Sequence, residues 1–149
     1  MNACEAVNKA LKEKNSIDQV YWVGCGGSAI SLYPAHYLLL TESKRVDSHI
    51  FTAREFTIAT PKKLGEHSLV VALSHSGNTP EVIDACKLAS SRGAFVFSMS
   101  SAAGSAIDKP EWNTYIYEWS NETRQKDLDP AQSLMVAAEL LKVQEDYIA

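Results

Sequence analysis

The sequence has few cysteines, no long apolar segment and no concentration of positive charge. Its three cysteines are an odd number at wide spacing, which predicts reduced thiols and excludes a disulfide framework or a thiolate zinc cluster. No run approaches the roughly 20 apolar residues that a bilayer-spanning helix needs. The first residues lack the basic and apolar stretches of a secretory signal. We therefore expect a cytoplasmic protein with no membrane partner.

Basic residues are scattered along the chain, and the formal net charge is -4. This pattern excludes the clustered basic surface of a nucleic-acid-binding protein, so we expect no nucleic-acid partner. His36, His49 and His67 have no Asp, Glu, Cys or His at the spacing of zinc ligands, so we also expect no metal site. A small molecule is the remaining class of ligand.

The order of elements predicts an α/β fold. Short β-branched or aromatic runs alternate with longer helix-compatible stretches, which is typical of a parallel sheet with helices on both faces, a three-layer αβα sandwich. At 149 residues the chain fits one domain. The five predicted strands are Val20–Val23, a run near Val46–Phe51, Ser68–Leu73, Ala94–Phe97 and Thr114–Tyr117.

Three helices have clear sequence signals. Apolar residues over Val82–Ala89 recur at helical spacing, and Gly93 ends that helix. A second helix is predicted over Asp129–Tyr147, with its first residue as the cap and Pro130 in the first helical position. The stretch Ser28–Leu40 is also helical, but its internal proline removes a backbone hydrogen bond, which predicts a kink or a late helix start.

The segment Ser74–Glu81 follows the third predicted strand and opens the next helix, where doubly wound sheets bind their ligands. Gly77 permits a tight turn, Thr79 can cap the helix and Pro80 suits its first position, so free backbone N–H groups should point into the loop. With the helix dipole and the loop hydroxyls, these donors form an anion site without a lysine. No P-loop ending is present, which disfavours a nucleoside triphosphate with magnesium. Because ordinary turns use the same residue types, a purely structural loop is the alternative.

The loop after the first predicted strand, Gly24–Ala29, matches the loose dinucleotide pattern G-x-G-x-x-G/A. A nicotinamide dinucleotide needs an acidic residue about 20 residues later to hold the ribose, and His49–Ala53 offers none. In the alternative, Gly26 and Gly27 bring the backbone close to another ligand while Ser28 adds a hydroxyl. Glycines that serve only a tight turn are the structural alternative. We expect no cofactor.

Together the two loops resemble those of the sugar isomerase (SIS) domain family. Gly-Cys-Gly-Gly-Ser follows the first strand, Ser-x-Ser-Gly-x-Thr follows the third, and the likeness extends over nearly the whole chain. It implies a flavodoxin-like SIS fold. The stretches Tyr-Trp-Val-Gly-Cys-Gly-Gly-Ser, Tyr-Pro-Ala and Ser-His-Ser-Gly-Asn-Thr-Pro-Glu are most similar to the amino-terminal half of fructosamine (fructoselysine-type) 6-phosphate deglycases. Those enzymes split phosphorylated Amadori products into glucose 6-phosphate and an amine or amino acid.

The resemblance implies roles for individual side chains. The phosphate-binding residues that it implies are Ser28, Ser74, His75, Ser76, Gly77 and Thr79. The residues that it implies for the pocket rim are Gly26, Gly27, Ser100 and Ser101. Ring opening and proton transfer between adjacent carbons require an acid and a base near the carbonyl, and Glu55 and His75 are the candidate catalytic residues. Glu55 equally fits a carboxylate at a helix start, and His75 a hydrogen-bonding partner within the loop.

In relatives with two SIS domains, the acid and base come from the second domain, in a Glu-Phe-x-His-Gly-Pro stretch that this sequence lacks. We expect residues 1–149 to form a single SIS domain, either a lone domain or the amino-terminal half of a two-domain protein. The expected function is phosphosugar binding within an isomerase or deglycase that acts on fructosamine 6-phosphates. A non-catalytic sugar-phosphate sensor is the alternative.

The expected ligand is a sugar phosphate of the fructose 6-phosphate or glucose 6-phosphate type. The expected macromolecular partner is a second SIS domain, or further copies of the chain in a homo-oligomer. Trp112 and Trp119 flank the fifth predicted strand, and large exposed aromatic residues commonly mark interfaces. We therefore expect these two tryptophans to face a partner subunit.

Overall fold

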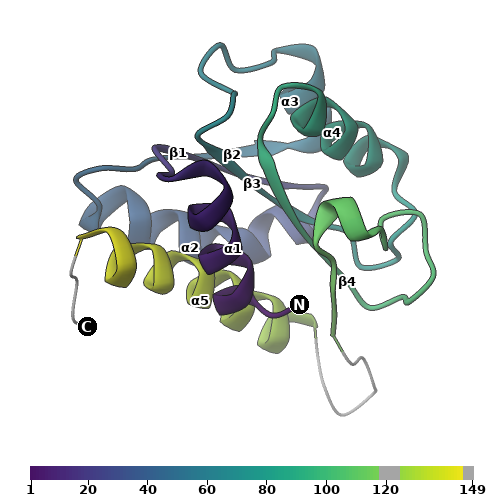
Figure 1. Cartoon of the computed structure of the whole chain (residues 1–149). Helices are drawn as coiled ribbons and strands as arrows, with labels where there is room; N and C mark the ends of the chain where they lie inside the picture. The colour runs from purple at the N-terminus through teal and green to yellow at the C-terminus, as the bar shows by residue number, and fades with distance from the viewer. Residues whose placement is uncertain (118–124, 146–149) are drawn as a thin grey trace.

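A parallel five-stranded sheet with the strand order β2-β1-β3-β4-β5 forms the centre of the computed structural model (Figure 1). The structure describes residues 1–117 and 125–145, with the backbone alone for 125–130. The strands are β1 (Gln19–Gly24), β2 (Asp47–Thr52), β3 (Ser68–Leu73), β4 (Phe95–Ser100) and β5 (Tyr115–Ile116). The α/β class and all five predicted strands are confirmed.

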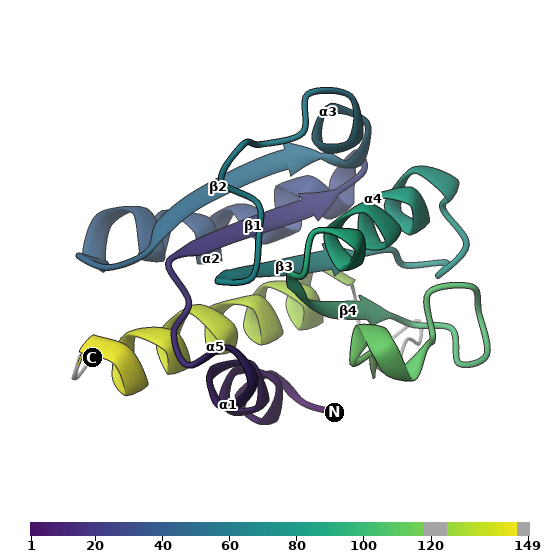
Figure 2. The same cartoon turned by 45° about the horizontal axis from the view of Figure 1, so that its top comes forward.

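Helices cover both faces of this sheet, as the turned view in Figure 2 shows. The helices are α1 (Ala3–Lys14), α2 (Gly27–Glu42), α3 (Ala53–Ile58), α4 (Pro80–Ser91) and α5 (Gln125–Glu145). Side chains that alternate along β1 divide the core: Trp22 packs with α1, α2 and α5, whereas Tyr21 packs with α3 and α4. The predicted three-layer αβα sandwich is therefore confirmed.

The three central strands place the candidate loops at one edge of the sheet. Every residue of β1, β3 and β4 is buried, as expected for parallel strands that are covered on both faces. Val23 of β1 lies beside Ala72 of β3, so the two strands end almost level. The strand that follows β1 in the chain, β2, lies on one side of the β1–β3 pair, and the strand that follows β3, β4, lies on the other side. The chain therefore continues from the ends of β1 and β3 in opposite directions. This is the switch point at which open α/β sheets bind ligands.

Helix α1 has no counterpart among the helices predicted from the sequence. Its amino-terminal end is capped by Asn2, whose side-chain oxygen accepts a 2.9 Å hydrogen bond from the backbone N–H of Glu5. Its buried residues are Ala3, Ala6, Val7 and Ala10. Three of these are alanines, so the apolar stripe that fixes the helix is a weak signal in the sequence.

Helix α2 contradicts one of the two predictions made for it, a kink at the proline or a late helix start. It begins at Gly27 and includes Pro34, so the predicted late start is wrong. A proline inside a helix removes a single backbone hydrogen bond and disturbs the preceding turn. The apolar inner face of α2 packs against the sheet and α5, which stabilises the helix on both sides of the proline.

The last helix also differs from the prediction at its start. It begins at Gln125, so Asp129 is not its cap and Pro130 lies inside it. Pro130 is the sixth residue of the helix, where its missing N–H removes one backbone hydrogen bond, so this proline does not mark the first position. The predicted end at Tyr147 lies outside the described residues. Among the described residues, no helix is long and apolar enough to cross a membrane.

Trp112 does not face a partner. It ends a short 3-10 turn, η1 (Pro110–Trp112), and is only 3% exposed. Its indole Nε1 donates a 3.1 Å hydrogen bond to Oγ of Ser90, so the ring is fixed between η1 and α4. The interface prediction is therefore wrong for Trp112, because the η1 turn folds back over the sheet. Trp119 lies outside the described residues.

Candidate functional site

Ser74 anchors the loop after β3. Its backbone N–H donates to the carbonyl of Met99 on β4 over 3.1 Å, and its side chain is buried. Oγ of Ser74 accepts a 3.1 Å bond from the backbone N–H of Gly77 and lies 2.9 Å from Oγ1 of Thr79. These contacts close the loop into a compact turn before α4 begins.

Gly77 has a backbone conformation and an environment that only glycine fits. Its φ of +74° lies in the left-handed region, and its carbonyl accepts a 2.9 Å bond from the backbone N–H of Ile107. A Cβ at this position would clash with the side chain of Ser105 and lie 2.8 Å from Oγ of Ser100. The loop after β4 therefore lies directly against the turn.

The loop after β4 braces the loop after β3 through several hydrogen bonds. The carbonyl of His75 accepts from the backbone N–H of Ser101 at 3.1 Å, from its Oγ at 2.7 Å and from Oγ of Ser100 at 3.2 Å. The side-chain oxygen of Asn78 accepts a 2.9 Å bond from the backbone N–H of Ala106. Ser100 is fully buried, so the structure places its hydroxyl beneath the loop.

The imidazole of His75 lies against Tyr117. Nδ1 of His75 is 3.0 Å from the Tyr117 hydroxyl, and the two rings stack with centroids 5.9 Å apart. Tyr117 is only 3% exposed, and its backbone N–H donates to the carbonyl of Ser100 over 3.0 Å. The segment after β5 thus fixes the histidine ring, a contact that the sequence did not indicate.

The free hydrogen-bond donors lie at the amino-terminal end of α4. Within the described residues, the backbone N–H groups of Ser76, Thr79 and Glu81 have no recorded acceptor. Thr79 occupies the predicted cap position, but its side chain bonds to Ser74 and makes no capping hydrogen bond. Ser76 is exposed, and its Oγ accepts a 3.2 Å bond from the N–H of Asn78. Neutral donors and the positive end of the helix dipole therefore face solvent together.

The loop after β1 lies at the end of the neighbouring strand. Gly26 has a φ of +53°, and a Cβ added at Gly26 or Gly27 would meet nothing within 4 Å. Ser28 is half-buried in the first turn of α2, where its N–H donates to the carbonyl of Cys25 over 3.0 Å. The glycines leave open space beside the backbone, which a ligand can occupy.

Glu55 takes part in the cap of α3. Its Oε1 accepts from Oγ1 of Thr52 at 2.8 Å and from the Thr52 N–H at 3.2 Å, which forms a capping box. The adjacent Arg54 extends to α4, where its Nη2 is 3.6 Å from Oε1 of Glu81. The structure therefore places Arg54 beside the first turn of α4, whereas the described contacts of Glu55 lie within α3 and its cap.

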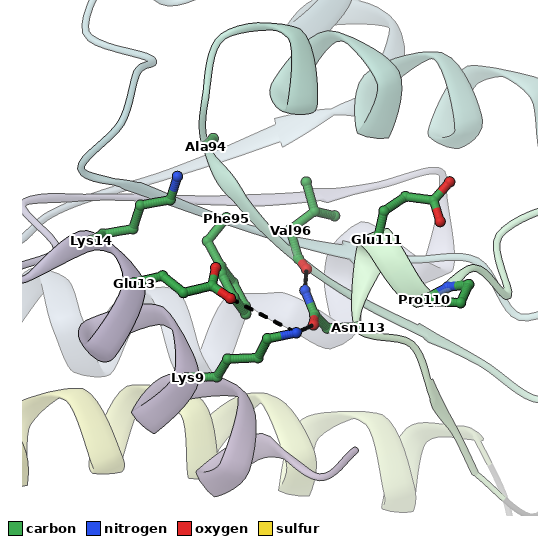
Figure 3. Close-up of a pocket in the computed structure, with 9 residues that line it drawn as sticks. All are labelled: Lys9, Glu13, Lys14, Ala94, Phe95, Val96, Pro110, Glu111 and Asn113. Atoms are coloured by element: carbon green, nitrogen blue, oxygen red, sulfur yellow. Dashed lines mark hydrogen bonds and ion pairs between the residues drawn. The ribbon is translucent and has the colours of Figure 1, made fainter.

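A separate hollow lies at the opposite end of β4, as Figure 3 shows. It has a volume of about 260 Å³, and Lys9, Glu13 and Lys14 of α1 form one side of it. Nζ of Lys9 donates a 2.7 Å hydrogen bond to Asn113, whose Nδ2 donates to the carbonyl of Val96 over 2.9 Å. These bonds connect α1 to β4 through Asn113.

Within residues 1–117 and 125–145, no group of three or more His, Cys, Asp and Glu side chains has the arrangement of a metal site. The described groups at the carboxyl ends of β1 and β3 are hydroxyls, amides, the thiol of Cys25 and one histidine. Hydroxyl and amide groups of this kind can donate hydrogen bonds to an anion or to a neutral polyol.

The comparisons with known proteins agree with this fold. A family model described as the SIS domain matches residues 15–137. Fructosamine deglycase FrlB of Bacillus subtilis (strain 168) is 39% identical over 118 residues, which are 79% of this chain and 36% of that protein. Fructoselysine 6-phosphate deglycase of Escherichia coli (strain K12) is 31% identical over 94 residues, which are 63% of this chain and 27% of that protein.

Solved structures show the same architecture. A Salmonella typhimurium LT2 protein assigned as a phosphosugar isomerase superposes with a TM-score of 0.90 at 30% identity, over 98% of this chain and 44% of that one. Glucosamine-6-phosphate deaminase of Thermotoga maritima shares the fold, with a TM-score of 0.69 at 20% identity over 93% of this chain and 46% of that one. The chain therefore spans less than half the length of these four relatives.

Proposed function

Because the chain belongs to the SIS domain family, we propose that its Ser74–Thr79 loop binds the phosphoryl group of a sugar phosphate of the fructose 6-phosphate or glucose 6-phosphate type. The observation that carries the proposal is the set of free N–H groups of Ser76, Thr79 and Glu81 at the start of α4. A phosphate dianion there accepts hydrogen bonds from neutral donors and is stabilised by the helix dipole.

The proposed roles of the neighbouring residues follow from their positions. Ser76 and Thr79 donate their hydroxyls to phosphate oxygens, and Ser28 donates from the loop after β1. The open backbone at Gly26 and Gly27 lets the sugar approach. Ser74, Gly77, Ser100 and Ser101 hold the loop in the binding conformation.

The finer proposal is a domain of a sugar-phosphate isomerase or deglycase that acts on fructosamine 6-phosphates. Its support is the similarity to the two deglycases, together with the phosphate site. In this proposal, a second SIS domain or subunit completes the catalytic site. His75 and Glu55 are the candidate proton-transfer groups on this chain, and His75 is the better placed because it belongs to the loop.

Calorimetric titration with fructose 6-phosphate and glucose 6-phosphate tests the binding site. The double substitution Ser76→Ala and Thr79→Val removes two proposed donors, and we expect it to weaken binding at least tenfold, equivalent to about 1.4 kcal/mol. Ser91→Ala, at the far end of α4, is the matched control because its exposed Oγ only bonds within the helix. Unphosphorylated fructose and glucose should not bind. Equal affinity in the double variant and the control would refute the phosphate site.

A sugar-phosphate sensor without catalysis is the second candidate function. The observation that favours it is the capping box, since Oε1 of Glu55 already accepts two hydrogen bonds from Thr52. Turnover of a phosphorylated Amadori compound by the purified chain tests the sensor. Turnover that Glu55→Gln abolishes would exclude it, whereas binding without turnover agrees with both functions, because the first proposal places part of the catalytic site on a second domain or subunit.

A further inference from the structure

Arg54 joins the starts of two helices. It is the second residue of α3, and its Nη2 lies 3.6 Å from Oε1 of Glu81, the second residue of α4. Figures 1 and 2 show α3 and α4 side by side, and buried residues of both helices, Phe56 and Val82 among them, belong to one core cluster. The core therefore fixes the place from which the arginine side chain reaches α4.

This position of Arg54 is unfavourable within its own helix. Arg54 lies in the first turn of α3, where the positive end of the helix dipole repels a cation. The ion pair with Glu81 offsets this repulsion, but the arginine side chain is 66% exposed, so the pair is open to water. Exposed ion pairs add little to the stability of a fold. A role in stability alone therefore does not account for an arginine at this position.

Glu81 brings a negative charge to the proposed anion site. Its backbone N–H is one of the free donors at the start of α4, and its side chain belongs to the same turn. A carboxylate in the first turn of a helix is attracted by the free N–H groups and by the positive end of the dipole. Thr79 leaves these groups uncapped, because its side chain makes no capping hydrogen bond. The Glu81 carboxylate is therefore an internal competitor for the donors that a phosphate would use.

The contact with Arg54 keeps this competitor apart from the donors. Among the described residues, no hydrogen bond connects the Glu81 carboxylate with the N–H groups of Thr79 or Glu81, whereas the Arg54 guanidinium lies within ion-pair distance of it. An unpaired carboxylate in this turn would also repel a phosphate dianion, because like charges interact strongly at short range. The guanidinium offsets that charge. The ion pair therefore leaves the start of α4 open to an anion.

We propose that Arg54 is a positioning residue that holds the carboxylate of Glu81 away from the free N–H groups at the start of α4. The arginine thereby keeps these donors available to an anion, and it acts through Glu81 without touching the anion itself. Its effect on the affinity for a sugar phosphate rests on the proposed function of the Ser74–Thr79 loop. The position of the Glu81 carboxylate does not depend on that function and is measurable without a ligand.

Amide proton shifts of the isotopically labelled chain, measured without ligand, test the position of the carboxylate. In Arg54→Met, the amide proton of Thr79 or Glu81 should move downfield because the released carboxylate accepts a hydrogen bond from it. Adding Glu81→Gln should reverse most of this movement, since a neutral oxygen accepts more weakly. Lys63→Met is the matched control, because it breaks a similarly exposed ion pair, 3.7 Å from Asp47. Amides that do not move in Arg54→Met, or that stay moved in the double variant, would overturn the proposal.

Calorimetric titration of the same variants with glucose 6-phosphate tests the consequence for binding. Arg54→Met should weaken binding at least about fivefold, and the double variant should bind within about twofold of Glu81→Gln alone, because Arg54 acts through Glu81. Lys63→Met should leave the affinity unchanged. An equal loss from Arg54→Met with and without Glu81→Gln would show direct contact with the phosphoryl group and overturn the proposal. A wild-type chain that binds no sugar phosphate would refute the phosphate site, and the amide shifts alone would then decide the role of Arg54.

Discussion

Oγ of Ser74 and Oγ1 of Thr79 lie 2.9 Å apart, and the same Ser74 oxygen accepts the backbone N–H of Gly77. If Thr79 donates its proton to a phosphate oxygen, Ser74 must donate to Thr79 in turn. That arrangement agrees with Ser74 accepting from Gly77, because a hydroxyl has one proton and two lone pairs. The buried serine therefore orients the hydroxyl of Thr79, one of the proposed phosphate donors.

Ser74→Ala should destabilise the fold, because it removes both side-chain hydrogen bonds from a residue that is 2% exposed. We expect a loss of about 1–3 kcal/mol in the free energy of unfolding, measured by urea denaturation. Ser76→Ala is the comparison within the same loop. Since Ser76 is exposed, its loss should be below about 0.5 kcal/mol. Equal stability of the two variants would contradict a structural role for Ser74.

Gly77→Ala should disrupt the loop far more than Gly26→Ala. Both glycines have positive φ, a backbone conformation that L side chains rarely adopt, so each alanine adds backbone strain. Only the Cβ at position 77 also clashes, with Ser105 and Ser100, whereas position 26 is open. Denaturation should rank Gly77→Ala as the less stable variant, and the calorimetric titration should show that it no longer binds glucose 6-phosphate. Similar stability for both variants would show that the loop does not require glycine at 77.

Substitutions at the cap of α3 distinguish a structural role of Glu55 from a catalytic one. Thr52→Ala should cost about 1 kcal/mol of stability because it removes the cap hydroxyl. Glu55→Gln keeps a side-chain oxygen that can accept in the capping box, so its stability should be nearly unchanged. If Glu55→Gln loses turnover at wild-type stability, the carboxylate takes part in proton transfer. If it loses stability as Thr52→Ala does, its role is structural.

The buried His36 should make stability dependent on pH. Its Nδ1 is 2.8 Å from Oγ of Ser48, which accepts from Nε1 of Trp22 and keeps a proton that it can donate to a neutral imidazole. Burial, together with the nearby His49, lowers the pKa of His36 below its ordinary value. The unfolded chain therefore binds the proton more readily, and stability that is fully present above about pH 6.5 is lost as the pH falls below it.

Urea denaturation from about pH 7 to about pH 5.5 measures this effect. His36→Gln should reduce the dependence of the unfolding free energy on pH, although His49, whose pKa burial also lowers, keeps part of it. Among the described residues, the groups recorded as interacting with the His36 ring are Ser48, Tyr33 and His49, and none of these carries a fixed charge. An unchanged pH dependence in the variant would contradict the assignment.

Strong local patterns made most of the fold predictable from the sequence. The apolar runs Val20–Val23 and Ser68–Leu73 are central strands buried on both faces. Strands of this kind are nearly continuous apolar runs, which makes them easy to recognise in a sequence. Gly93 ends α4 with a φ of +82°, as expected from the residue type. The α1 helix was missed because its buried face consists mostly of alanine.

The part of the site that was not predictable consists of contacts between distant segments. Ser105 and Ile107 shape the turn at Gly77 from a loop far along the chain, and Tyr117 fixes His75. No local pattern marks these residues, because their roles arise only when β4 and β5 pair beside β3. The loop sequence indicated which donors were available, whereas the structure showed that Ser74 orients Thr79.

Amide chemical shifts measured during a titration with fructose 6-phosphate test the phosphate site most directly. In the isotopically labelled chain, the largest shifts should fall on the amides of Ser76, Thr79 and Glu81, with smaller ones at Gly27 and Ser28. Inorganic phosphate should shift the first group, whereas fructose should leave it unchanged. Saturable binding of fructose 6-phosphate that leaves the first-turn amides of α4 unshifted would contradict the account.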